Sequence, residues 1–294
     1  MTRLLDLTAS QLTSLDRAGL RHAVRDSEGR VVAAEVIGPA FPLIDQVSNA
    51  ELVAAMGADL IILNLVDVTA PTLRGMPPCP PDDVIHQARR LTGRPLGLNL
   101  EPVGVPAGHL ATQDNARRAV DLGIQMVVVT ANPSTGADNA AITRGIEQVS
   151  TGVGQDALVV GGRMHAAGVA GQSGRSLVAP DDVAAFVEAG ADMVLLPAPG
   201  TVPGLTLERV GELAEHAHTL GALVLASIGT SQEGADEHTV RTIALAAKQA
   251  GADVLHLGDA GYTGVAVPTN ITTASVAIRG VRHTWRRMAW SPLR

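Results

Sequence analysis

Residues that can act as acids, bases, metal ligands or hydrogen-bonding groups recur at one kind of place in this sequence, directly after short apolar runs. They are Glu35, Asn64 with Asp67, Asn99 with Glu101, Thr130 with Asn132, Arg163 with His165, Ser227 with Thr230 and Ser231, and His256 with Asp259. One further run, which ends at Leu196-Pro197, carries no such group. Strand ends meet solvent in any protein, but so many functional residue types at one position favour a functional site.

The carboxylates in this set suit a hard divalent cation. Glu35, Asp67, Glu101 and Asp259 are oxygen ligands of the kind that Mg²⁺ and Mn²⁺ prefer. No spacing such as HExxH is present, so the prediction depends only on position after the apolar runs. We predict that Glu101 and Asp67 bind Mg²⁺ or Mn²⁺.

Two histidines could transfer protons, because imidazole titrates near neutral pH. We predict His165 as the acid–base group, with Arg163 and Asn99 positioning the substrate. Glu35 and His256 are further catalytic candidates. For each histidine, a hydrogen-bonded structural role remains the alternative.

Lys248 is the only lysine, and it lies just before Gly251, in the last turn of an expected outer helix. Schiff-base chemistry needs a desolvated lysine amine in the site, so a covalent aldolase mechanism and a PLP cofactor are excluded. An enzyme that forms an enolate here would need a divalent metal instead. NAD is not expected either, because the glycine pattern Gly152-Val153-Gly154 precedes an apolar run instead of following it.

Two glycine-rich segments, 227–234 and 258–264, follow the seventh and eighth apolar runs. Glycine-rich backbone after the last two strands of an α/β barrel, near a helix N-terminus, commonly binds phosphate. The glycines could also serve only to make tight turns. We predict a phosphate-binding site made by Asn64, Ser227, Gly229, Thr230, Ser231, Gly258, Asp259 and Gly261.

The elements that must position these residues form a repeat. Glycines recur at intervals of about 30 residues, each followed by an apolar run, at Gly29, Gly57, Gly93, Gly123, Gly154, Gly190, Gly221 and Gly251. Glycine ends a helix in the left-handed conformation, and a buried parallel strand is apolar on both faces. Each interval therefore predicts one helix and one strand.

Eight such units predict a single (β/α)₈ TIM barrel, with a doubly wound open sheet as the alternative. Residues 206–220 and 236–250 read as amphipathic outer helices, and residues 270–289 as the last helix. Residues 8–26 predict an extra N-terminal helix that caps the bottom of the barrel. We therefore expect one domain over 1–294, with a helical extension at 1–28 and the barrel at 29–294.

Composition limits the partners. The formal net charge of −7 and the scarcity of aromatic residues argue against nucleic-acid binding. No apolar stretch is long enough to span a membrane, and the N-terminus lacks a secretory signal. A single cysteine excludes an intramolecular disulfide framework. We expect a cytoplasmic protein that binds a small molecule, with no membrane partner, and that forms a homo-oligomer.

The whole chain resembles a family of uncharacterised bacterial TIM-barrel proteins. The resemblance is carried by the runs Leu98 to Val103, Met164 to Gly168, Pro203-Gly204, Ala226 to Asp236, His256 to Tyr262 and Ala277 to Thr284. Such proteins tend to be labelled phosphoenolpyruvate phosphonomutase-like or haloacid-dehalogenase-like hydrolases. The second label implies two aspartates two residues apart, and Asp67-Val68-Thr69 lacks the second of them. The first label agrees with the barrel, although its paired-aspartate metal motif is not found.

These observations predict a metal-assisted lyase, isomerase or epimerase that acts on a small phosphorylated carbonyl metabolite. A sugar phosphate or a phosphoenolpyruvate-like compound would fit. The alternative is a non-catalytic barrel that binds a phosphorylated metabolite as a sensor or an assembly partner.

Overall fold

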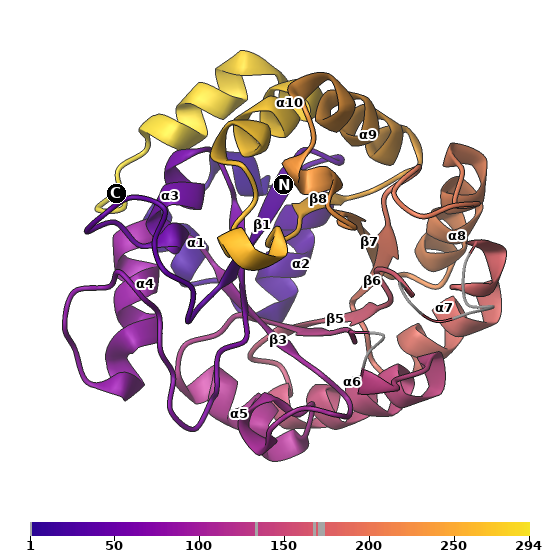
Figure 1. Ribbon diagram of the computed structural model, residues 1–294, viewed down its shortest axis with the longest axis horizontal. Coiled ribbons are helices and arrows are strands. Elements are labelled where there is room, and N and C mark those ends of the chain that lie inside the picture. The colour runs from indigo at the N-terminus through magenta and orange to yellow at the C-terminus, as the bar shows by residue number, and fades with distance from the viewer. Residues whose placement is uncertain (1, 133–134, 167–168, 170–173) are drawn as a thin grey trace.

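The computed structural model describes residues 2–132, 135–166, 169 and 174–294, and it is a closed barrel of eight parallel strands (Figure 1). Each strand pairs with the next along the chain, and β8 returns to pair with β1. This closure confirms the predicted TIM barrel and excludes the open sheet. The strands are β1 (Val31–Ile37), β2 (Leu60–Asn64), β3 (Leu96–Leu100), β4 (Met126–Val129), β5 (Leu158–Gly162), β6 (Met193–Pro197), β7 (Leu223–Ile228) and β8 (Val254–Leu257).

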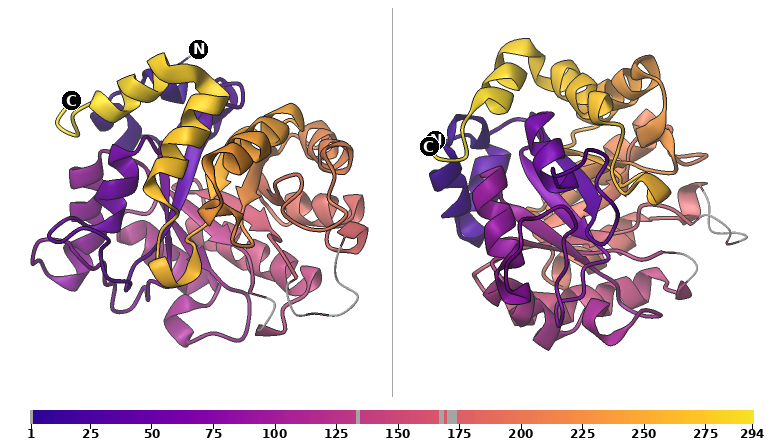
Figure 2. Two further views of the ribbon diagram at one scale, coloured as in Figure 1. Left: turned by 45° about the horizontal axis from the view of Figure 1, so that its top comes forward. Right: turned by 60° about the vertical axis from the view of Figure 1, so that its left-hand side comes forward.

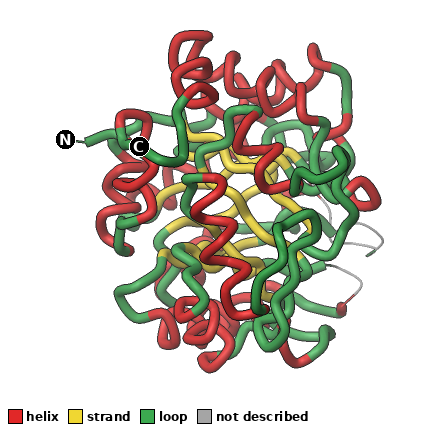
Figure 3. The backbone as a smooth tube through the Cα atoms, turned by 90° about the vertical axis from the view of Figure 1, so that its left-hand side faces the viewer, coloured by secondary structure: helices red, strands yellow, loops and turns green. Residues whose placement is uncertain are grey.

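Helices surround the strands on the outside of the barrel, as the tube in Figure 3 shows. The eight glycines of the sequence repeat all have positive φ, the conformation in which glycine is favoured. The helices are α1 (Ala9–Thr13), α2 (Arg17–Arg25), α3 (Asn49–Ala55), α4 (Val84–Thr92), α5 (Gln113–Asp121), α6 (Asn139–Val153), α7 (Pro180–Glu188), α8 (Leu207–Thr219), α9 (Glu237–Gln249) and α10 (Pro268–Ala289).

The apolar strand residues divide into two cores because side chains alternate along a strand. One core, which includes Val32, Ile61 and Val194, packs between the strands and the outer helices. The other, which includes Val31 and Ile62, fills the barrel interior. Glu35, Asn64, Asn99, Ser227 and His256 have the interior parity of their strands, so their side chains lie above the inner core at the C-terminal end.

The N-terminal segment closes the opposite end of the barrel, but as two helices and not the single helix expected over 8–26. Asp16 is the N-cap of α2, and its side chain accepts a hydrogen bond from Gly19 N. Leu12 of α1 and Leu20 of α2 pack against the inner core of the barrel. The capping role predicted for this segment is therefore confirmed, and the break between α1 and α2 is set by the N-cap at Asp16.

Three of the eight repeat glycines, Gly57, Gly190 and Gly251, begin a Gly-Ala-Asp sequence whose aspartate has one shared structural role at this N-terminal end. Asp59, Asp192 and Asp253 each accept a hydrogen bond from a backbone N–H at the start of the neighbouring strand, at 2.8 to 2.9 Å. Each also faces a basic side chain, which for Asp192 is Arg17 of α2 at 2.8 Å. The repeated aspartates are therefore structural.

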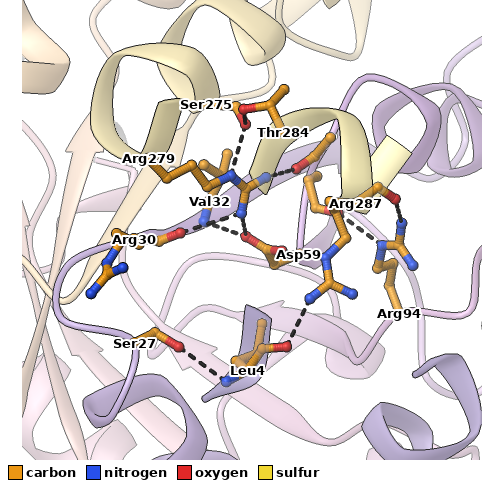
Figure 4. Close-up of polar contacts among 12 residues, drawn as sticks. Leu4, Ser27, Arg30, Val32, Asp59, Arg94, Ser275, Arg279, Thr284 and Arg287 are labelled. Atoms are coloured by element: carbon orange, nitrogen blue, oxygen red, sulfur yellow. Dashed lines mark hydrogen bonds and ion pairs between the residues drawn. The ribbon is translucent and has the colours of Figure 1, made fainter. Parts of the chain in front are cut away.

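Asp59 lies in a buried cluster with Arg94, Arg279 and Arg287 (Figure 4). Arg279 and Arg287 belong to α10, which packs over the end of the barrel near the N-terminus (Figure 2). The chain ends meet there, since Ser10 N donates to Arg294 O at 2.9 Å. Arg279 and Arg287 thus have structural roles, in which they contact Asp59 and backbone carbonyl oxygens.

Within the described residues, no helix combines the length and apolar character needed to cross a membrane.

Candidate functional site

A pocket of about 440 Å³ opens at the C-terminal end of the barrel, where the sequence pattern places the functional residues. Loops after five strands, β3, β4, β5, β7 and β8, contribute to it, together with residues of β1, β2 and β3. Its lining residues are Glu35, Asn64, Asn99, Glu101, Thr130, Ala131, Asn132, Met164, His165, Gly229, Thr230, Ser231, Glu233, Gly258 and Asp259.

The pocket is acidic. Glu35, Glu101, Glu233 and Asp259 line it, and no Lys or Arg is among its described lining residues. Burial raises the pKa of Glu35 well above its usual range, and the charges of Asp259, Glu233 and Glu101 raise it further. Burial also raises the pKa of Glu101 and Glu233. The pKa values of three of the four carboxyl groups in the pocket are thus raised, that of Glu35 the most strongly.

Two amides link the acidic loops across the pocket. Asn64 Nδ2 donates to Asp259 Oδ2 at 2.9 Å, and Asn99 Nδ2 donates to Asn64 Oδ1 at 3.2 Å. Asn99 Oδ1 is buried and has no hydrogen-bond partner in the described structure. Asn99 of β3 therefore presents an amide oxygen whose hydrogen-bonding capacity is unused, as expected for a ligand-binding group.

Among the described lining residues of the pocket, His165 is the one histidine. Its pKa is lowered by burial and by the positive charge of Arg163, and only partly restored by Asp259. At neutral pH the imidazole is therefore uncharged and able to accept a proton.

A buried chain of polar contacts lies directly beneath the pocket floor. Ser227 Oγ is 2.8 Å from His256 Nδ1 and donates to Met164 Sδ at 2.9 Å. His256 Nε2 lies 3.6 Å from Glu35 Oε2. Ser227 and His256, both predicted site residues, are thus connected to the pocket through Glu35 and Met164 and do not line it themselves.

The two glycine-rich loops meet at the pocket as predicted, but a carboxylate of the chain lies between them. Glu233 is buried, which raises its pKa, and the nearby backbone N–H groups of Ser231 and Ala260 partly offset this effect. Ser231 and Ala260 have φ of 73° and 55°. An anion at this place would have to compete with Glu233, a residue that the sequence pattern did not single out.

Besides Ser227 and His256, three more predicted residues lie outside the pocket lining. Asp67 Oδ1 accepts hydrogen bonds from Thr69 N and Thr69 Oγ1, at 2.7 and 2.6 Å. Arg163 is buried and donates to Asn139 Oδ1 of α6 at 3.3 Å, because it follows β5 on the outward-facing side. Gly261 also falls outside, although its N–H donates to Asp259 Oδ1 at 2.9 Å.

The described residues contain no group of three His, Cys, Asp or Glu side chains arranged to hold a metal ion. The donor types at the pocket nevertheless suit a hard cation. Asn99 Oδ1, Thr130 Oγ1 and, among the carboxylates, Glu233 Oε2 are buried oxygens with no hydrogen-bond partner in the part of the chain that the structure describes. Mg²⁺ commonly uses only one or two protein carboxylates and keeps several waters, so this donor set fits it in kind.

Solved structures share the fold. The chain resembles 2,3-dimethylmalate lyase, a member of the PEP mutase/isocitrate lyase superfamily, with a TM-score of 0.54 and 14% identity over 87% of this chain and 82% of that one. An aldolase named QR15 aligns with a TM-score of 0.47 and 18% identity over 85% of this chain and 94% of that one. At these identities the likeness shows the barrel fold alone.

No curated protein matches the chain. The closed barrel gives no support to the haloacid-dehalogenase-like label. The model of a family described as a domain of unknown function, DUF7916, matches residues 5–294. The chain therefore belongs to the DUF7916 family.

Proposed function

We propose that the chain is an enzyme of the lyase, isomerase or epimerase type that acts on a small carbonyl metabolite with the help of Mg²⁺ or Mn²⁺. One observation carries the proposal: four carboxyl groups and three side-chain amides converge on a single pocket that has no Lys or Arg among its described lining residues. The 2,3-dimethylmalate lyase that shares the barrel is itself a lyase by name.

The charge of the pocket is the reason for the cation. Carboxylates close together repel one another and would repel an anionic substrate or a developing enolate. A bound divalent cation would offset this electrostatic repulsion and would polarise the substrate carbonyl. Glu101 and Asp259 are the pocket residues we propose to hold it, in place of the pair Glu101 and Asp67 expected from sequence.

The chain's own residues would orient the substrate and move its proton. Asn64 and Asn99 offer amide groups to a carbonyl or hydroxyl substituent, since they are already held by Asp259 and by each other. Neutral His165 is the base that would accept the proton next to the carbonyl. A phosphate group on the substrate would bind to the cation, because the backbone N–H groups of Ser231 and Ala260 already interact with Glu233.

Calorimetry with Mg²⁺ and Mn²⁺ tests the proposal. We expect the wild-type protein to bind at least one ion and Glu101→Gln to lose at least about tenfold in affinity, because the amide keeps the shape without the charge. Glu147→Gln, an exposed position on α6, is the matched control and should bind as the wild type does.

The second measurement is the exchange of the proton next to the carbonyl in D₂O, followed by NMR on a panel of 2-oxo and 2-hydroxy acids. Wild-type protein that binds neither ion and exchanges no substrate proton would overturn the proposal. Loss of ion affinity in Asp67→Asn with none in Asp259→Asn would restore the ligand pair predicted from the sequence.

A further inference from the structure

Four side chains form a continuous chain from the barrel interior to the pocket. In order they are Met164 Sδ, Ser227 Oγ, the His256 imidazole and Glu35 Oε2, at separations of 2.9, 2.8 and 3.6 Å. Ser227 and His256 are almost fully buried. Glu35 and Met164 are the two members of the chain that line the pocket. Neighbouring strands β7, β8 and β1 supply three of the four, so their order follows from strand pairing.

The hydrogen bonds along this chain of side chains can be oriented in only one consistent way. A thioether accepts but never donates, so the single hydroxyl hydrogen of Ser227 points to Met164 Sδ. The contact between Ser227 Oγ and His256 Nδ1 then needs its hydrogen from the imidazole. Neutral imidazole carries one N–H, so Nε2 is left with a lone pair, and that atom has no hydrogen-bond partner in the described structure.

The lone pair on Nε2 faces the Glu35 carboxyl group. An ionised Glu35 would place a second acceptor there, in a buried position that other acidic groups also face. Those groups are Asp259 after β8, Glu233 after β7 and Glu101 after β3, each of which raises the pKa of Glu35 through its charge. No described cation is paired with Glu35. A protonated Glu35 removes the conflict, because its O–H can then be directed at the Nε2 lone pair, which lies 3.6 Å from Oε2.

We propose that Glu35 is the proton donor of this pocket, and that His256 holds it in the acid form as an Nδ1–H tautomer fixed by Ser227 and Met164. The inference rests on the proposed function for the reaction that uses the proton. In that reaction the O–H bond of Glu35 breaks and a new O–H bond forms on the substrate oxygen that carries the negative charge. Glu35 remains as a carboxylate until solvent returns a proton after product release.

The assignment complements that of His165. A neutral histidine and a protonated glutamate at one pocket form a base and an acid that are both in the required state at neutral pH. In this scheme His256, Ser227 and Met164 are positioning residues that act through Glu35. Met164 lines the pocket, but none of the three takes part in the proton transfer to the substrate.

Imidazole ¹⁵N NMR of the free protein tests the tautomer directly. We expect one neutral histidine with its proton on Nδ1, whose signals disappear in His256→Gln. In Ser227→Ala the acceptor for that N–H is gone, so we expect the Nδ1–H tautomer to lose its dominance. His22→Gln, at an exposed site on α2, should leave the His256 signals unchanged.

Infrared spectroscopy tests the carboxyl group. At neutral pH we expect a protonated-carboxyl band that is lost in Glu35→Gln, retained in Glu147→Gln, and titrated away only as the pH rises. An Nε2–H tautomer of His256, or the absence of a Glu35 acid band in the wild type, overturns the inference. If both signatures are found but no carbonyl substrate reacts, the proposed function fails while the protonation of Glu35 stands.

Discussion

Asp59 and Arg287 form an ion pair that is excluded from solvent, with Arg287 Nε 2.7 Å from Asp59 Oδ1. Arg279 pairs with the same carboxylate, and Arg94 lies close enough to affect it. Burial alone would raise the pKa of Asp59, but the guanidinium groups of Arg279 and Arg287 hold it below its usual value. One carboxylate thus joins the start of β2 to the last helix and neutralises part of a buried cationic cluster.

We predict that Asp59→Asn lowers the free energy of unfolding by about 3–5 kcal/mol, because it leaves buried guanidinium groups without a counter-charge. Urea unfolding followed by circular dichroism measures the change. The matched control is Asp6→Asn, which weakens partly exposed pairs with Arg3 and Arg286 and should cost only about 0–1 kcal/mol. Equal small losses in the two variants would contradict the structural role of Asp59.

Lys248→Ala should leave activity on any substrate unchanged. The lysine lies on the outer helix α9, as expected from the sequence, and its Nζ donates to Ile278 O of α10 at 2.5 Å. Loss of that hydrogen bond should cost about 1 kcal/mol of stability. Mass spectrometry after borohydride treatment with substrate checks the chemistry. A reduced adduct on Lys248 would refute the exclusion of Schiff-base catalysis.

The barrel could be predicted because its signals are local. A glycine that ends each helix and an apolar run that follows it can both be read within one segment, and together they placed Glu35, Asn64, Asn99, Glu101, His165 and Asp259 at the pocket. Each of these follows or ends a strand, where the fold itself determines the location.

The positions of the remaining site residues depend on side-chain direction and loop conformation, which the sequence pattern does not reveal. Arg163 faces outward because side chains alternate from one residue to the next, and the parity is known only once the strands are paired. Asp67 is turned away after Leu65, whose φ is 55°, an unusual backbone conformation for leucine. Glu233 reaches the pocket only because Thr230 and Ser231, at φ of 56° and 73°, turn the loop after β7 inward.

Glu233→Ala should create affinity for inorganic phosphate. Removal of the carboxylate frees the N–H groups of Ser231 and Ala260 and removes a negative charge from between the loops. Gain of even one charge-assisted hydrogen bond, at about 1.5–3 kcal/mol, corresponds to at least about tenfold in affinity. Phosphorus NMR titration measures the binding. Glu233→Gln keeps an acceptor oxygen in place and should gain less.

Tight phosphate binding by the wild-type protein, unchanged in Glu233→Ala, would show that the glycine-rich loops bind an anion without displacing Glu233. It would also restore the phosphate site in the form expected from the sequence.

The last prediction concerns pH and the buried imidazole of His256. Burial lowers the pKa of His256 from 6.5 to about 4, so the folded protein keeps it neutral where the unfolded chain protonates it. As the pH falls from 6.5 to 4 the unfolded state binds the additional proton, and the free energy of unfolding decreases. Below the folded-state pKa both states are protonated and this loss is complete, at about 3 kcal/mol.

Urea unfolding from pH 7 to pH 4 measures the slope of the free energy of unfolding against pH. His256→Gln should have a shallower slope than the wild type, whereas His22→Gln, at an exposed site, should match the wild type. A wild-type slope that is preserved in His256→Gln would mean that His256 has the same pKa in the folded and unfolded states, which would contradict the assignment of a buried imidazole that stays neutral below pH 6.5.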